Sequence, residues 1–403
     1  MFDPKLCKGA DISTTYAGIK LRSPFILSSG PLGYGAEGLI RAHNAGCGAV
    51  VTKTLRLNRA INPAHHIGTM GPNSLINCEK WADSDRLQWY EKEIPAAKAA
   101  GAVVIASVGH TPAEAEAIVA DAEKAGADML ELVSYTEDTL LPMLRIAKKK
   151  VNIPVICKLS ANWPDPVAAG IRCMQEGADA LCAIDSIGPG LKIDIKHAPP
   201  ELMGADGCGW ISGGAIKPQS MYINAALSRK IPNLDIYGSG GCMSAADAVE
   251  FIMAGCRGVG YCSAGILYGM DYVEKMCYDL SALLSKLGYA SLEEARGAAL
   301  GSFPEKDIVT RLQFGYRPDA DPATGFKGCT HCNRCVKACC YEARKLDETG
   351  MHVDADLCRD CGVCVSICPT GALTATMLPQ SQTDLDRVAE AAAFDEYVKS
   401  INS

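Results

Sequence analysis

The sequence lacks the apolar and basic segments that would place the protein in a membrane or on nucleic acid. It contains no stretch of about 18 apolar residues, the length that a membrane-spanning helix needs, and residues 1–7 carry no apolar run suited to a signal peptide. The formal charge, 39 basic minus 46 acidic residues, is −7, and the densest basic run, 148–150, is most simply a helix end facing water. We therefore expect a cytoplasmic protein with no membrane span and no nucleic-acid partner.

A dinucleotide-binding fingerprint is also missing. The first expected strand is followed by the run Ser-Ser-Gly-Pro-Leu-Gly at 28–33, in which Pro31 breaks the turn that a Rossmann fold requires. No such fingerprint occurs later in the chain. The sequence therefore indicates no site where NAD(P)H would deliver a hydride, and we expect electrons to be exchanged with another protein.

Cysteine, by contrast, is abundant and unevenly distributed. Of the 20 cysteines, nine lie between Cys329 and Cys368. In a reducing cytosol, clustered cysteines indicate metal binding rather than disulfides. Eight of the nine form two runs with bacterial ferredoxin spacing, the second ending in Cys-Pro: Cys329-x2-Cys332-x2-Cys335-x3-Cys339 and Cys358-x2-Cys361-x2-Cys364-x3-Cys368.

This doubled spacing predicts two [4Fe-4S] clusters that exchange their fourth ligands, because the x3 step turns the chain away from the first three irons. One cluster would take Cys329, Cys332, Cys335 and Cys368, and the other would take Cys358, Cys361, Cys364 and Cys339. Zinc is the alternative metal, since paired C-x2-C motifs also bind zinc, but the doubled spacing favours clusters. We interpret Cys340 as a neighbour rather than a ligand.

Short β-branched, apolar runs alternate with Ala-rich helical patterns over the first 260 or so residues. Several helical patterns end in a glycine placed as a helix C-cap. The sequence predicts an α/β fold, a (β/α)8 TIM barrel, in which a hairpin over 12–21 fills the floor. A doubly wound sheet uses the same alternation, but its first turn would carry the missing fingerprint. The expected strands are 24–28, 49–53, 103–107, 129–133, 153–158, 180–184, 235–238 and 258–262.

The expected domains follow from these patterns. Residues 1–302 would form the barrel, and residues 303–327, which contain three prolines, would be a linker. A small α+β domain resembling bacterial ferredoxins would span 328–378, and a helical tail would span 379–403.

In a TIM barrel the chemistry gathers where the strands end. Lys53 and Lys158 end apolar strands, and burying a lysine without a partner costs several kcal/mol. A flavin, which becomes anionic on reduction, would pair with such a cation. The glycine turns at 238–241 and 262–265 follow the seventh and eighth expected strands, where this fold commonly binds phosphate.

The segments 23–33, 50–54, 154–162, 211–218 and 238–241 are similar to the FMN barrel of dihydroorotate dehydrogenases. They are closer still to the FMN and iron–sulfur half of dihydropyrimidine dehydrogenases, and 73–80 resembles a substrate-side loop of those enzymes. The resemblance covers residues 10–375. It implies FMN as cofactor, with these binding residues: Ser29, Gly30, Lys53, Thr54, Lys158, Asp185, Gly213, Gly214, Gly240, Gly241, Cys262 and Ser263.

The loop after the fourth expected strand departs from the family. The family has Asn-x-Ser-Cys-Pro there, and its cysteine or serine exchanges a proton with the substrate. Here the asparagine becomes Val133 and the cysteine falls at about Thr136. Tyr135 is our preferred proton donor, with Thr136 and Glu137 as further catalytic candidates. His110 and His197 are other titratable groups that follow expected strands.

The substrate side departs as well. Asp185-Ser186 replaces an Asn-Thr pair that hydrogen-bonds the pyrimidine in the family. Because a carboxylate only accepts hydrogen bonds, a ring with a different donor pattern, or a cation, is favoured. The expected substrate residues are Asn73, Asn162, Asp185 and Ser186.

The sequence therefore predicts a flavin- and iron–sulfur-dependent oxidoreductase acting on a C=C or C=N bond of a small cyclic or conjugated substrate. Its two [4Fe-4S] clusters would connect FMN to an external carrier, either an NAD(P)H- and FAD-binding reductase subunit or a ferredoxin, in a homo- or hetero-oligomer. The alternatives are a dihydropyrimidine dehydrogenase subunit proper and an electron-transfer subunit without its own substrate.

Overall fold

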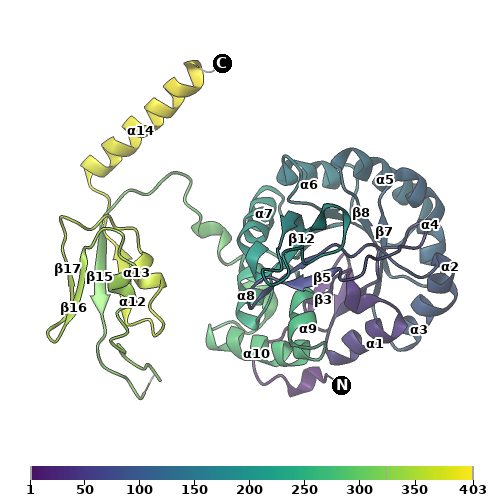
Figure 1. Cartoon of the computed structure of the whole chain (residues 1–403), viewed down its shortest axis with the longest axis horizontal. Helices are drawn as coiled ribbons and strands as arrows, with labels where there is room; N and C mark the ends of the chain where they lie inside the picture. The colour runs from purple at the N-terminus through teal and green to yellow at the C-terminus, as the bar shows by residue number, and fades with distance from the viewer. Residues whose placement is uncertain (1, 324, 402–403) are drawn as a thin grey trace. The chain divides into compact units, whose positions relative to one another are not determined.

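The computed structural model describes residues 2–323 and 325–401, which divide into two compact units, Met1–Ser302 and Phe303–Ser403. The first unit contains a closed barrel of eight parallel strands with helices around it (Figure 1). This confirms the predicted TIM barrel. The strands, in chain order, are β3 (Phe25–Leu27), β4 (Ala49–Val51), β7 (Val104–Gly109), β8 (Met129–Val133), β9 (Val155–Leu159), β10 (Ala180–Ala183), β13 (Ile236–Gly238) and β14 (Gly258–Tyr261).

Helices connect the strands and end where the sequence predicted. Gly46, Gly126, Gly177 and Gly255 all adopt positive φ, between 92° and 123°, directly before a strand. L-residues with a Cβ rarely adopt this conformation, so glycine is favoured at these helix ends. The covering helices are α1 (Ala36–Ala45), α3 (Ile94–Ala99), α4 (Pro112–Lys124), α5 (Glu137–Lys150), α6 (Pro166–Gln175), α7 (Lys217–Lys230), α8 (Ala245–Met253) and α10 (Tyr272–Lys286).

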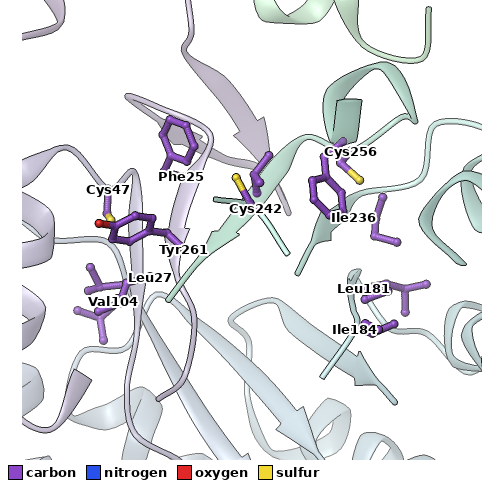
Figure 2. Packing of buried hydrophobic residues seen from close by; sticks show 14 of the residues in the cluster. Phe25, Leu27, Cys47, Val104, Leu181, Ile184, Ile236, Cys242, Cys256 and Tyr261 are labelled. Carbon is purple, nitrogen blue, oxygen red and sulfur yellow. The ribbon is translucent and has the colours of Figure 1, made fainter. Parts of the chain in front are cut away.

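The barrel strands are buried on both faces, and alternate residues serve two separate cores. Phe25 and Leu27 of β3 belong to the larger core between strands and helices, whereas Ile26 belongs to a smaller core inside the barrel. Leu27, Val104, Leu181 and Ile236 contribute to the larger core from four different strands (Figure 2). This is why the strands read as continuous apolar runs rather than as an alternating pattern.

A hairpin fills the floor of the barrel, as expected. Its strands are β1 (Thr14–Tyr16) and β2 (Ile19–Leu21), which pair antiparallel. Tyr16 is fully buried in the inner core, donates a hydrogen bond to the carbonyl of Leu181 at 3.0 Å, and packs edge-on against Tyr237. The hairpin therefore closes the end of the barrel opposite the strand C-termini.

A second sheet, which the sequence analysis did not predict, lies outside the barrel. It has four strands in the order β11 (Ile187–Leu191), β12 (Cys208–Gly213), β6 (Ser74–Asn77) and β5 (Ile67–Thr69). These segments belong to long connections that follow β4 and β10. The sheet carries several residues of the candidate site described below.

The second unit is a small α+β module. Strand β15 (Leu312–Tyr316) pairs with β18 (Leu373–Met377), and β16 (Arg344–Asp347) pairs with β17 (Gly350–Val353). Two short helices, α12 (Arg334–Lys337) and α13 (Val363–Ser366), pack together, and α14 (Gln382–Ile401) ends the described chain. Strand β15 lies within 303–327, the range expected to be a linker, and pairs there with β18. No helix in the described ranges is long and apolar enough to span a membrane.

Candidate functional site

A cavity of about 770 Å³ lies at the carboxyl ends of the barrel strands, within the range of about 300–1,000 Å³ typical of small-molecule sites. Residues at or just after the ends of all eight barrel strands contribute to its wall. The cavity brings together most of the residues singled out in the sequence: Ser29, Gly30, Lys53, Thr54, Tyr135, Lys158, Asn162, Asp185, Ser186, Gly213, Gly240, Gly241, Cys262 and Ser263.

Four expected site residues are not part of this wall: Asn73, Thr136, Glu137 and Gly214. The Asn73 carbonyl accepts a hydrogen bond from the Gly214 amide at 2.8 Å, and its side chain accepts one from Tyr268 at 3.3 Å. Thr136 precedes α5, and Glu137 pairs with Arg172 of α6. Of the three catalytic candidates, Tyr135 is therefore the one that reaches the cavity.

Lys53, which follows β4, is buried and paired. Its ammonium lies 2.5 Å from the Glu79 carboxylate, and each side chain is only 11% exposed. Glu79 follows strand β6 of the outer sheet, and both residues line the cavity. Because the two side chains pair at low exposure, Lys53 is not an unpaired buried ion beside the cavity.

Lys158 lies near the end of β9 and is 5% exposed. Its ammonium lies 3.4 Å from Asp185, which follows β10, and 3.9 Å from Glu131 on β8. Burial opposes the charged form, but Asp185 and Glu131 outweigh it and raise the pKa of Lys158. Lys158 is therefore a fixed cation on the cavity wall.

Glu131 lies inside the barrel and is fully buried. One carboxyl oxygen accepts a hydrogen bond from the Tyr237 hydroxyl, and the other, Oε1, makes no hydrogen bond of ordinary geometry, although the Cys182 thiol faces the carboxyl group. Burial raises the pKa of this carboxyl, while Lys158 acts against the shift. Glu131 is not part of the cavity wall, so Lys158 separates it from a ligand there.

The backbone of the cavity leaves room for a ligand at several glycines. A Cβ on Gly30 would lie 2.8 Å from the Cys262 sulfur, which is too close for an undisturbed contact. Gly240 and Gly241, after β13, have φ of 92° and 110°. Ser263, after β14, donates a hydrogen bond to Ser212 at 3.0 Å. Burial raises the pKa of the Cys262 thiol to about 11, so it stays protonated at neutral pH.

An aromatic stack forms another part of the wall. The rings of His110 and Tyr135 lie 4.1 Å apart and nearly parallel, at 9°. Burial and the neighbouring Arg56 lower the pKa of His110 to about 4, so its ring is neutral at pH 7. Burial raises the pKa of Tyr135, so the phenol keeps its proton. Trp163 fixes this loop by donating to the Tyr135 carbonyl at 3.0 Å.

Asn162 and Ser186 lie next to each other at the cavity. The Asn162 amide donates to the Ser186 carbonyl at 3.4 Å, and its oxygen accepts from the Gly188 amide at 3.2 Å. These contacts join the ends of β9 and β10 and place two polar side chains beside Asp185.

In the second unit, four cysteines surround a separate cavity of about 20 Å³: Cys329, Cys332, Cys335 and Cys368. This is the set assigned to one cluster from the spacing, including the distant Cys368. In the described ranges, no three Cys, His, Asp or Glu side chains converge on a single point as around one metal ion.

The other expected cysteine ligands lie around α13 and just after α12. Cys364 is within α13, and its sulfur accepts a hydrogen bond from Arg344 at 3.0 Å. Hydrogen bonds to ligand sulfurs are one way in which proteins tune iron–sulfur potentials. Cys340 is exposed.

Glu79 on the cavity wall and Glu131 behind it are charged residues that were not predicted from the sequence. Glu79 lies in the 73–80 loop, which resembles a substrate-side loop of dihydropyrimidine dehydrogenases but gave no reason to select this residue. Glu131 lies in the middle of an apolar strand. The sequence does carry a signal for Glu131, which is an acidic residue inside the apolar run Met-Leu-Glu-Leu-Val. A buried carboxylate needs partners, so this residue could have been selected as a candidate.

The fold, the strand-end cavity and the cysteine region together define an oxidoreductase with an FMN-type barrel and a 4Fe-4S module. Residues 94–284 match the dihydroorotate dehydrogenase family, and residues 326–342 and 351–374 match 4Fe-4S binding domains. The chain belongs to the dihydroorotate dehydrogenase family, whose members act on CH–CH groups.

Two relatives of the chain are named for different enzymes. The catalytic subunit of dihydroorotate dehydrogenase B (NAD(+)) from Methanothermobacter thermautotrophicus is 32% identical over 311 residues, covering 72% of this chain and 98% of the relative. Subunit PreA of the NAD-dependent dihydropyrimidine dehydrogenase from Escherichia coli is 26% identical over 399 residues, covering 90% of this chain and 95% of the relative. Both are named as subunits of larger enzymes.

Proposed function

We propose that the protein reduces or oxidises a C=C or C=N bond of a small cyclic or conjugated substrate. Electrons would pass between FMN in the barrel and an external carrier through two [4Fe-4S] clusters. The observation that carries this proposal is the single cavity that contains both buried strand-end lysines and the glycine turns after β13 and β14.

The residues of the cavity fit FMN. Lys158 is a fixed cation suited to the pyrimidine side of the flavin, where negative charge develops on reduction. Gly240, Gly241 and Ser263 lie at the strand ends where this fold binds phosphate, and Gly30 allows a flat ring to approach the backbone. When bound, FMN supplies a two-electron redox centre that can also exchange single electrons.

The chain's own residues would position the substrate and move a proton. Asn162, Asp185 and Ser186 offer acceptors and one amide donor at the cavity wall. The Tyr135 hydroxyl is our candidate for donating the proton that accompanies reduction of the substrate, because its raised pKa keeps it protonated. Its stack on His110 would hold the phenol in place.

The cysteine region would carry the electrons. One cluster is assigned to Cys329, Cys332, Cys335 and Cys368, which the 20 Å³ cavity supports, and the other to Cys339, Cys358, Cys361 and Cys364. A reductase subunit that binds NAD(P)H and FAD, or a ferredoxin, would be the partner, since the chain has no dinucleotide fingerprint.

Anaerobic isolation tests this proposal. The protein should contain one FMN and about eight irons with about eight acid-labile sulfides per chain. Zinc in place of iron, or FAD in place of FMN, would contradict it. Dithionite-reduced protein should then be mixed with pairs of saturated and unsaturated cyclic compounds, and reoxidation of the flavin identifies the substrate. If no compound reoxidises the flavin although an external carrier does, the chain is an electron-transfer subunit.

A dihydropyrimidine dehydrogenase subunit is the second candidate. The similarity to the E. coli subunit extends over 90% of the chain, which supports it. Uracil and thymine are therefore the first compounds to test. The Asp185→Asn variant restores an amide at this position, and a pyrimidine that reoxidises only this variant would show that Asp185 excludes pyrimidines from the natural protein.

A further inference from the structure

A carboxyl group without an obvious structural role lies directly behind the cavity wall. Glu131 is fully buried inside the barrel, and its Oε1 makes no hydrogen bond of ordinary geometry, although the Cys182 thiol faces the carboxyl group. The Lys158 ammonium lies 3.9 Å from that oxygen, too far for a hydrogen bond but close enough for strong electrostatic coupling. An unsatisfied buried carboxylate is costly, so its position calls for an explanation.

The groups facing Glu131 come from several elements of the barrel. Lys158 lies on β9, Tyr237 on β13, Cys182 on β10 and Tyr16 in the floor hairpin, while Asp185 follows β10. Lys158 is the one cation among them, and it faces two carboxyl groups. Fully ionised, the trio of Glu131, Lys158 and Asp185 would carry a net negative charge in a mostly buried site.

The net negative charge of this trio favours the binding of one additional proton. Of the two carboxyl groups, Glu131 is the better proton acceptor. Burial raises the pKa of the Glu131 carboxyl, whereas the Asp185 side chain is 40% exposed and closer to Lys158. A further negative charge in the cavity would attract Lys158 and strengthen the tendency of Glu131 to bind a proton. The reduced, anionic flavin is such a charge.

We propose that Glu131 is a redox-linked proton acceptor, which takes up a proton when the flavin in the adjacent cavity is reduced. The inference rests on the proposed function, because it requires FMN beside Lys158. Two electrons and one proton convert oxidised FMN to its anionic reduced form. A second proton, which comes from solvent, forms an O–H bond on Glu131.

The pH dependence of the flavin potential measures this uptake. The flavin of the full-length, cluster-loaded protein is titrated electrochemically from about pH 6 to about pH 9, and its own absorbance is followed. The natural protein should take up more than one proton per two electrons over part of this range. The Glu131→Gln variant should take up one, because an amide cannot be protonated there.

Infrared spectroscopy gives an independent measurement. The reduced-minus-oxidised difference spectrum should show the carbonyl stretching band of a newly protonated carboxyl group. This band should be absent from Glu131→Gln. Should that variant not fold, Tyr237→Phe serves instead: loss of the hydrogen bond to the carboxylate raises its pKa further, so the carboxyl is protonated before reduction and the difference band disappears.

Glu93→Gln is the matched control. Glu93 is also a buried carboxyl, 6% exposed, but it accepts a hydrogen bond from the Ala36 amide and does not line the cavity. This variant should keep both the extra proton and the infrared band. Uptake of one proton in the natural protein, or an extra proton that persists in Glu131→Gln, would overturn the inference. Isolation of a protein without FMN would instead refute the proposed function.

Discussion

The ammonium of Lys158 lies 3.4 Å from the carboxylate of Asp185, so a cation at the end of one barrel strand is shared with an acid that follows the next. A ligand in the cavity meets this pair rather than an isolated charge. The charge that the ligand experiences therefore depends on both residues, and it can be changed in either direction by substitution.

Replacing Lys158 with alanine should lower the potential of the bound flavin, because the anionic reduced form loses its counter-charge. The expected change is on the order of 50 mV for a two-electron couple, with weaker FMN retention. Spectroelectrochemistry and equilibrium dialysis measure these quantities. The Asp185→Asn variant is the matched opposite, since removing the acid should raise the potential. An unchanged potential in both variants would show that neither residue acts on the flavin.

A Cβ at position 30 should interfere with cofactor binding. In Gly30→Ala the new methyl group would lie 2.8 Å from the Cys262 sulfur, so one of them has to shift, and both residues line the cavity. We expect the affinity for FMN, measured by equilibrium dialysis, to fall by about tenfold, equivalent to about 1.4 kcal/mol. The double variant Gly30→Ala/Cys262→Ala removes the sulfur and should recover most of the loss. If the double variant binds as poorly as the single one, this contact is not the cause.

Damage to one cluster should separate electron delivery from substrate chemistry. Cys335→Ser removes a proposed cluster ligand, a cysteine that lines the small cavity with Cys329, Cys332 and Cys368. Turnover with the physiological donor should be lost, whereas chemically reduced FMN should still reduce the substrate once. Stopped-flow absorbance of the flavin distinguishes the two reactions. Loss of both reactions with FMN retained would show that the barrel chemistry itself depends on the cluster.

His110 should make the barrel less stable in acid. Its pKa falls from the usual 6.5 to about 4 in the folded protein because of burial and Arg56. The unfolded chain therefore binds the proton first, and the stability contributed by the neutral ring is lost as pH falls from about 6.5 toward 4. The upper limit of the loss, for a pKa lowered by about 2.5, is about 3.4 kcal/mol.

The His110→Gln variant should lose less thermal stability between pH 7 and pH 5 than the natural protein. His43, whose pKa burial and Arg22 also lower to about 4, leaves part of the loss in place. The comparison concerns the slope with pH, since loss of the stack on Tyr135 can change the absolute melting temperature. Equal slopes would mean that His110 is already protonated near pH 5.

The barrel was predictable because each strand and helix carries its own local signal. Apolar strands followed by polar residues, and helices ended by glycines such as Gly46 and Gly255, identify the repeat without knowledge of tertiary contacts. The cysteine spacing likewise joined Cys368 to a run about 30 residues earlier. Such signals depend only on residues close together in the sequence, so they can be recognised from a single sequence.

The partners of the lysines could not be predicted in this way. Glu79 reaches Lys53 from the outer sheet, whose strands come from connections with no regular pattern. Thr136 and Glu137 were further catalytic candidates beside the preferred Tyr135, but Thr136 precedes α5, and Glu137 pairs with Arg172 and is not part of the cavity wall. Strand β15 was missed because its run, Leu-Gln-Phe-Gly-Tyr, lies among prolines and contains a glycine.

The hairpin that fills the barrel floor affects how ligands enter and leave the cavity. In the described part of the barrel, Tyr16 packs against Tyr237 and the Leu181 carbonyl at the floor, whereas the cavity lies at the opposite end, where the strands finish. A cofactor and a substrate that occupy the cavity together would both enter at the strand ends. The ligand that lies deeper in the cavity would then bind first and dissociate last. The flavin would then bind before the first catalytic cycle, and a bound substrate would slow dissociation of the flavin.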